Sequence, residues 1–168
     1  LGDIYRDLGN HDLALAATLK SLELDPNNSN AQMNLGIIYK DLGSLDQALA
    51  ATLKSLELNP DNPNAHMNLG GIYRDIGNLD QALISSLRSL ELNPNKTSAL
   101  INLGSIYKDL GNLDQALSTT LKSLELECDN HTALTERGHI AAVTSLPVPI
   151  VIRKVIIITT SHAFDLMK

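Results

Sequence analysis

The sequence predicts an all-α solenoid built from repeated pairs of antiparallel helices. Three observations predict this class. Five residue types recur on a period of 34 residues, each period holds two stretches with apolar residues at helical spacing, and a glycine or proline follows each stretch. One such pair cannot bury its own apolar face, so neighbouring pairs must supply the core by stacking.

The period is set by residues that keep the same step along the chain. The motif Leu-Gly-x-Ile-Tyr begins at Leu1 and has close copies at Leu35, Leu69 and Leu103. Other positions keep the step as well: Gly9, Gly43, Gly77 and Gly111; Ala14, Ala48, Ala82 and Ala116; Ser21, Ser55, Ser89 and Ser123; Pro26, Pro60 and Pro94. We therefore expect four repeats over residues 1–128, the first of them truncated at its amino-terminal end because Leu1 matches the middle of a first helix.

The first helix of a repeat is illustrated by the copy that starts at Ser29. Ser29 is the expected cap, and the helix carries apolar residues three and four positions apart: Met33, Leu35, Ile38, Tyr39 and Leu42. Gly43 is expected to end it, because glycine adopts the left-handed conformation without a Cβ penalty.

The second helix begins with a capping-box pattern from Ser44 to Gln47 and ends before Pro60, which lacks the N–H of a continuing helix. Gly36 and Ala48 are expected to face each other where the two helices approach. Glycine costs about 1 kcal/mol relative to alanine inside a helix, so its recurrence requires a packing reason. Ser55 is expected to face the first helix of the next repeat.

The composition changes after Cys128, since residues 1–128 contain no Val and no Phe. Residues 129–146 are interpreted as a degenerate fifth-repeat or capping helix, which Pro147 ends. Residues 147–168 are predicted to be a divergent tail. Three interpretations of the tail stay open: a poorly ordered segment, an apolar plug against the end of the array, or sequence foreign to the original protein.

Composition and motifs exclude several kinds of chemistry. A net charge of −6 argues against a general nucleic-acid binder, and no apolar run reaches the length of a membrane span. The single cysteine cannot build a disulfide framework, and no two of the five histidines are three or four residues apart. The sequence holds no phosphate loop and no nucleophile elbow. We therefore expect a cytoplasmic protein that is not an enzyme and uses no metal or cofactor.

Leu-Gly-x-x-Tyr followed by Ala and Pro on a 34-residue period resembles the tetratricopeptide repeat, over about residues 1–128. The resemblance implies a right-handed superhelix whose first helices line a concave groove. Two family positions depart from the pattern. The usual Trp of the first helix is replaced by Gln32, His66 and Leu100. The large aromatic residue of the second helix is replaced by Thr18, Thr52, Ser86 and Thr120, each followed by leucine. We expect lighter packing as a result.

The resemblance also implies which residues point into the groove, beginning with Asn34, Asn68 and Asn102. An amide both donates and accepts hydrogen bonds, so this row is suited to hold the backbone of an extended peptide. Similar asparagine ladders occur in the superhelical arrays of O-glycosyltransferase-type proteins. The alternative is that the asparagines brace neighbouring helices, and the two uses are compatible.

Further groove positions refine the expected site. Apolar contact is expected from Met33, Met67 and Ile101. A position that varies between copies, and so could select side chains, holds Ile37, Gly71 and Ser105. A basic row consists of Lys40, Arg74 and Lys108, each followed by Asp, an alternation that is also typical of a solvated face. A groove that clamps a carboxyl terminus would need lysine in place of Met33 and Met67, which disfavours that role.

The sequence therefore predicts a non-catalytic scaffold module that binds a protein or an extended peptide. Two alternatives stay open. In the first, the array is the targeting arm of a larger enzyme, such as a glycosyltransferase. In the second, copies of the array associate head to tail, because the two ends of an array of near-identical repeats resemble each other.

Overall fold

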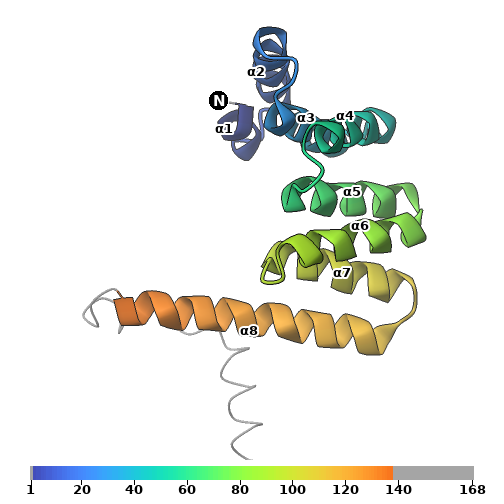
Figure 1. The fold of residues 1–168 in the computed structure, drawn as a ribbon, viewed down its shortest axis with the longest axis vertical. Helices are drawn as coiled ribbons and strands as arrows, with labels where there is room; N and C mark the ends of the chain where they lie inside the picture. The colour runs from blue at the N-terminus through green and yellow to red at the C-terminus, as the bar shows by residue number, and fades with distance from the viewer. Residues whose placement is uncertain (1, 138–168) are drawn as a thin grey trace, which may run out of the picture. The chain divides into compact units, whose positions relative to one another are not determined.

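The computed structural model describes residues 2–137, which form helices joined by short turns (Figure 1). No strand occurs in this part of the chain, and the predicted all-α solenoid of helix pairs is confirmed. The helices in chain order are α1 (Gly2–Asp7), α2 (His11–Leu24), α3 (Ser29–Asp41), α4 (Leu45–Leu58), α5 (Pro63–Ile76), α6 (Leu79–Leu92), α7 (Thr97–Asp109) and α8 (Leu113–Arg137).

The helices of residues 1–128 pack as hairpins that stack on one another. α3 packs against α4, α5 packs against α6, and each second helix also contacts the next first helix. Successive first helices approach each other directly, α1 with α3, α3 with α5 and α5 with α7, whereas the backbones of α2 and α4, and likewise those of α4 and α6, stay farther apart. Since a stack curves towards its more closely spaced elements, the first helices form the inner wall and the second helices form the outer face.

The core is built from small and aliphatic side chains. Ile38, Ile72 and Ile106 hold the same position in three successive repeats and are buried, as are the alanines of the second helices. Thr52 and Ser86, which stand where the family has a large aromatic residue, are also fully buried. Their hydroxyl oxygens have no hydrogen-bond partner within the described residues. Small side chains therefore occupy the hairpin interior.

Close approach of the two helices explains the recurring glycine inside each first helix. A Cβ added to Gly36 would clash with Thr52 Oγ1 and lie 3.1 Å from the carbonyl oxygen of Ala48. Gly70 meets Ser86 Oγ and the Ala82 carbonyl oxygen in the same way. The expected approach of Gly36 and Ala48 is therefore confirmed.

The turns follow the predicted chemistry, with small corrections at the caps. Gly43 has a φ of +74°, which favours glycine after the end of α3. Asn28, one residue before the expected Ser29, caps that helix by accepting from the Ala31 N–H at 2.9 Å. Ser44 forms no side-chain cap bond, whereas its equivalent Asn78 accepts from the Gln81 N–H. The longer asparagine side chain reaches a donor that the serine hydroxyl does not.

The recurring serine of the second helix also differs from expectation. The Ser55 hydroxyl donates to the Ser29 carbonyl oxygen at 2.8 Å, and Ser89 donates to that of Pro63 at 2.7 Å. Both acceptors lie on the first helix of the same repeat, not of the next. The serine therefore closes its own hairpin by satisfying a carbonyl in the first turn of its partner helix.

Helix α8 continues past the expected repeat boundary to Arg137. Cys128 stands where Pro26, Pro60 and Pro94 follow the earlier second helices. The residue before each of those prolines has an extended backbone, which a following proline favours. Without a proline at 128, α8 continues through residues 129–137, and the interpretation of 129–146 as a degenerate fifth-repeat or capping helix stays a prediction. The rest of that segment and the tail 147–168 lie outside the described residues.

Candidate functional site

The asparagine row lies on three consecutive first helices of the inner wall. Asn102 on α7 donates from Nδ2 to the Met67 carbonyl oxygen of α5 at 3.2 Å. It therefore braces two neighbouring helices. Asn34 and Asn68 are half-buried, and neither side chain forms a hydrogen bond with the described residues. One amide of the row is thus partly occupied, and two are open.

The basic row connects successive first helices. Lys40 Nζ on α3 lies 3.5 Å from Asp75 Oδ2 on α5, and Arg74 Nε on α5 donates to Asp109 Oδ2 on α7. The hydrogen bond from Arg74 holds the pKa of the Asp109 carboxyl below its usual value. Each ion pair joins one first helix to the next. Lys40 and Arg74 therefore hold neighbouring first helices together, and their charges are not free for a ligand.

Lys108 differs from the other two members of the basic row. It is exposed at the end of α7, and it forms no ion pair with another residue of the described range 2–137. It is therefore the member of the row whose ammonium group is available to a ligand.

The position that varies between copies, held by Ile37, Gly71 and Ser105, has different surroundings in each repeat. Gly71 is buried, and a Cβ added there would lie 3.5 Å from Asn102 Nδ2 and 3.7 Å from Lys40 Nζ. Lys40 from the preceding first helix and Asn102 from the next therefore border the space above Gly71. The Ser105 hydroxyl donates to the Ile101 carbonyl oxygen of its own helix at 3.1 Å, and Ile37 is half-buried.

The apolar positions are unequal in exposure. Met33 and Met67 are half-buried, and Met33 Sδ lies 3.9 Å from Asn62 Nδ2. Ile101 is 51% exposed and presents the largest free apolar surface of the three. His66, where the family has Trp, is bonded through Nε2 to the Pro60 carbonyl oxygen at 2.8 Å, so it stabilises the turn before α5.

The inter-repeat carboxylates Asp75 and Asp109 were missed as site residues. Their signal was present in the sequence, because an Asp lies 35 residues after Lys40 and another lies 35 residues after Arg74. Within residues 2–137 no three His, Cys, Asp or Glu side chains gather into a group that could hold a metal ion. No helix of that range has the length and apolar character needed to cross a membrane.

The comparisons with known proteins agree with this architecture. The chain is similar to solved structures of MamA. MamA AMB-1 is 29% identical, with 76% of this chain and 75% of that chain covered and a TM-score of 0.63. MamA MSR-1 is 28% identical, with 77% and 75% covered and a TM-score of 0.62. The structure of MamA from Desulfovibrio magneticus RS-1, at 22% identity, 76% and 72% coverage and a TM-score of 0.67, shares the fold.

No curated protein matches the chain. Family models described as TPR repeat match residues 2–43 and 38–73, and those described as tetratricopeptide repeat match residues 63–96 and 86–118. Together they cover residues 2–118, which include the inner wall and the asparagine row. The chain therefore belongs to the tetratricopeptide repeat family.

Proposed function

We propose that the inner wall of this array binds an extended segment of another polypeptide, so that residues 1–128 act as a non-catalytic scaffold module of the cytoplasm. The observation that carries the proposal is the pair of open amides at Asn34 and Asn68, on adjacent first helices. Each amide offers two donors and one acceptor, which suits the N–H and C=O groups of a peptide backbone. The likeness of the row to the ladders of O-glycosyltransferase-type arrays supports the same role.

The repeat spacing suits an extended chain. Packed helices lie about 8–10 Å apart, and an extended peptide advances about 3.3 Å per residue. Successive asparagines can therefore meet backbone groups about three residues apart. This contact does not depend on the side chains of the peptide.

The end of the wall at α7 adds a preference for particular side chains. Ile101 is half exposed, and Lys108 follows it by seven residues, which is about two helical turns on the same face. Together they favour a peptide that carries an apolar side chain and, further along, an acidic one.

The experiment starts from peptides selected from a random ten-residue library against the full chain. Replacing Asn34, Asn68 and Asn102 with Ala together should weaken their binding about 100-fold, because each backbone hydrogen bond contributes about 1 kcal/mol. The matched control replaces three exposed asparagines without side-chain bonds: Asn30, Asn59 and Asn93. Equal affinity of the two triple variants, with unchanged helical circular dichroism, would contradict the proposal.

A second candidate is head-to-tail self-association. It is favoured by the exposed side of α8 that corresponds to the side by which earlier second helices contact the next repeat. Leu113 and Leu117 are 66% and 62% exposed, whereas their equivalents Leu45 and Leu49 are half-buried beside α5. Light scattering of the Leu113→Glu, Leu117→Glu variant tests it. The candidate predicts a loss of mass at high concentration relative to wild type, and an identical mass would exclude it.

A further inference from the structure

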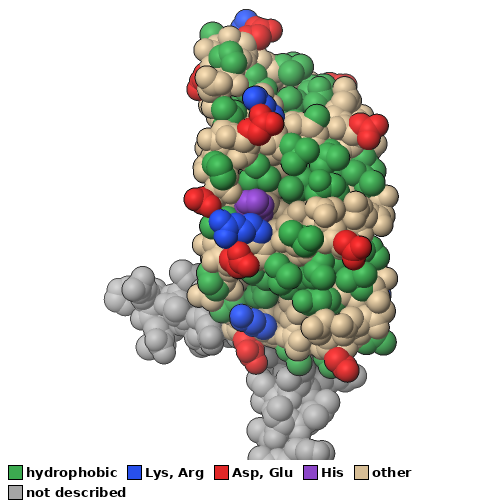
Figure 2. All heavy atoms as spheres, turned by 45° about the vertical axis from the view of Figure 1, so that its right-hand side comes forward, with side chains coloured by type: hydrophobic (Ala, Val, Ile, Leu, Met, Phe, Trp, Pro, Cys, Tyr) green, Lys and Arg blue, Asp and Glu red, His purple; other side chains and the backbone are tan. Residues whose placement is uncertain are grey.

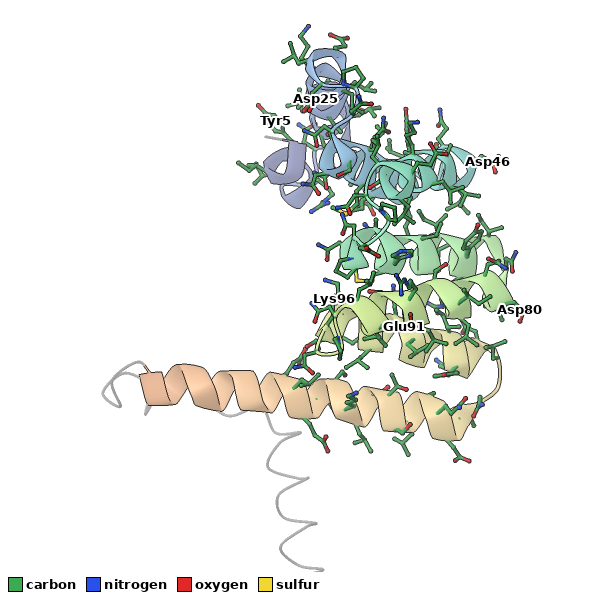
Figure 3. All side chains as sticks on the ribbon, in the orientation of Figure 1. Tyr5, Asp25, Asp46, Asp80, Glu91 and Lys96 are labelled. Carbon is green, nitrogen blue, oxygen red and sulfur yellow. The ribbon has the colours of Figure 1, made fainter. Side chains whose placement is uncertain are left out.

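The inner wall lacks a side chain at Gly71 on α5. Successive hairpins have the same orientation, since Asp46 and Asp80 at the starts of α4 and α6 lie at the same end of their hairpins in Figure 3. Gly71 therefore holds the place that Ile37 holds on α3 and Ser105 holds on α7. An added Cβ at Gly71 would meet nothing closer than 3.5 Å. At this position α5 leaves room for a group that the chain itself does not supply.

Polar side chains from three consecutive first helices surround this room. Asn102 Nδ2 on α7 lies 3.5 Å from the Cβ position of Gly71, and Lys40 Nζ on α3 lies 3.7 Å from it. Asn68 precedes Gly71 by three residues, which places it one turn away on the same side of α5. The Asn68 side chain forms no hydrogen bond with the described residues. A group that entered here would therefore meet nitrogen atoms of α3, α5 and α7.

The nitrogen atoms nearest to Gly71 keep unused hydrogen-bond donors. The NH₂ group of Asn102 carries two N–H donors, and the bond to the Met67 carbonyl oxygen uses one of them. The ammonium group of Lys40 carries three N–H donors, and its ion-pair partner within residues 2–137 is the single carboxylate of Asp75. The point above Gly71 is therefore suited to an acceptor oxygen that a ligand supplies.

The charges around this point favour a neutral ligand group over a carboxylate. Asp75 follows Gly71 by four residues on the same side of α5, and it already balances the charge of Lys40 at 3.5 Å. Figure 2 shows the same balance on the face that it draws, where Lys and Arg side chains lie beside Asp and Glu side chains. A ligand carboxylate above Gly71 would meet the negative charge of Asp75 without an unpaired cation to offset it.

A side-chain amide satisfies both the donors and the acceptor at this point. Its carbonyl oxygen accepts hydrogen bonds from Asn102 and Lys40, and its NH₂ group donates towards the oxygen atoms of Asp75 or Asn68. It carries no net charge, so it does not compete with the ion pair. A backbone carbonyl group offers the oxygen without the donor, and an aliphatic side chain offers neither.

Lys40 forms the movable side of the space, whereas the other sides are fixed. The Cε and Nζ atoms of Lys40 both lie 3.7 Å from the Cβ position of the buried Gly71. The side chains of Lys40 and Asp75 are 36% and 42% exposed, and ion pairs that are this exposed contribute little to stability. The end of Lys40 can therefore shift when a ligand group enters, while the bond to Met67 holds Asn102 in place.

We propose that the space above Gly71 is a subsite for the side-chain amide of an Asn or Gln residue in the bound peptide. The inference rests on the proposed function, because the peptide must lie along the inner wall for its side chain to reach α5. It adds a sequence preference to the asparagine contacts, which do not depend on the side chains of the peptide. The expected ligand is an extended segment with Asn or Gln at one fixed position.

The first experiment uses the peptides selected from the random ten-residue library against the full chain. They should share an Asn or Gln at one position. Replacing Asn by Leu, or Gln by Met, should weaken binding to wild type about 30-fold, the loss expected for two hydrogen bonds. Replacing them by Asp or Glu should also weaken binding, because of the charge of Asp75. Calorimetry measures each affinity. The proposal is overturned if no position favours Asn or Gln, or if the acidic form binds as tightly as the selected one.

The Gly71→Ala variant places the preference on the protein. Its methyl group occupies the point beside Asn102, and alanine is the better helix former, so the helix is retained. This variant should bind the selected peptide and its Leu or Met form with equal affinity. The matched control is Ser105→Ala at the equivalent position of α7, which should keep the wild-type preference. A full preference in Gly71→Ala would overturn the proposal.

The triple alanine variant of Asn34, Asn68 and Asn102 separates this inference from the proposed function. If it binds the selected peptides as tightly as its matched control does, the proposed function fails and the amide subsite fails with it. If it binds them about 100-fold more weakly while Gly71→Ala keeps the full preference, the peptide site stands and only the amide subsite fails.

Discussion

Two neighbouring glycines of α5 have different physical roles. Gly70 faces α6, and an added Cβ would clash with Ser86 Oγ and lie 3.2 Å from the Ala82 carbonyl oxygen. Gly71 lies on the inner wall, where an added Cβ meets nothing closer than 3.5 Å. The first glycine is required by helix packing, whereas the second leaves room between Lys40 and Asn102.

The pair predicts opposite effects of the same substitution. Gly70→Ala should lower the free energy of unfolding by about 1–3 kcal/mol, because the hairpin must open to admit the methyl group. Gly71→Ala should raise it by up to about 1 kcal/mol, because alanine is the better helix former. Urea denaturation followed by circular dichroism measures both, and equal effects of the two substitutions would disprove this assignment of roles.

The Arg74–Asp109 pair predicts a pH dependence of stability. The hydrogen bond lowers the pKa of Asp109 in the folded state, so its contribution is complete above the unfolded-state value of about 3.9. The contribution is lost as the pH falls through the lowered folded-state pKa. Wild type should therefore unfold at a higher urea concentration than Asp109→Asn at pH 7, and the difference should vanish near pH 2. A difference independent of pH would contradict the ion pair.

At the scale of elements, the sequence predicted where helices occur more accurately than where they begin. Glycine and proline set the ends of α3 and α4 as expected. The predicted cap of α3 was wrong by one residue. Asn28 and Ser29 are both good caps, and which of them caps the helix depends on the path of the preceding turn. The 34-residue period carries no information on that path.

The length of α8 gives the clearest test at this scale. Replacing Cys128 with Pro should end α8 near Leu126, as proline ends the earlier second helices, because it removes an N–H and favours an extended Glu127. Hydrogen exchange should then show lost protection in residues 128–137, and protection of α4 and α6 should not change. Cys128→Ala serves as the control and should keep the wild-type pattern. Full protection in the proline variant would disprove the role assigned to Cys128.

At the scale of the whole molecule, the period alone was sufficient to predict the solenoid. Which residues point into the groove was implied by the resemblance to the tetratricopeptide repeat and not by the period itself. The sequence could not predict which asparagines of the inner wall bond to a neighbouring helix and which stay available to a ligand. Asn102 and Asn68 have the same place in the repeat, yet Asn102 reaches the Met67 carbonyl oxygen and Asn68 forms no such bond. Whether the amide reaches that carbonyl oxygen depends on the geometry of neighbouring first helices, which the repeat period does not specify.

The basic row shows the same limit. The sequence presented Lys40, Arg74 and Lys108 as equivalent, but the first two pair with carboxylates of the next repeat. A Lys or Arg followed by Asp on each first helix is compatible with unpaired cations and equally with ion pairs between successive repeats. Only the relative placement of successive first helices decides between them.

The most direct test of the proposed peptide site is nuclear magnetic resonance of the side-chain amides during titration with a selected peptide. Binding at the inner wall predicts that the NH₂ signals of Asn34 and Asn68 move progressively, while those of the exposed Asn30 and Asn59 stay in place. If the peptide saturates the protein and the Asn34 and Asn68 signals do not move, the inner wall is not where this protein binds its partner.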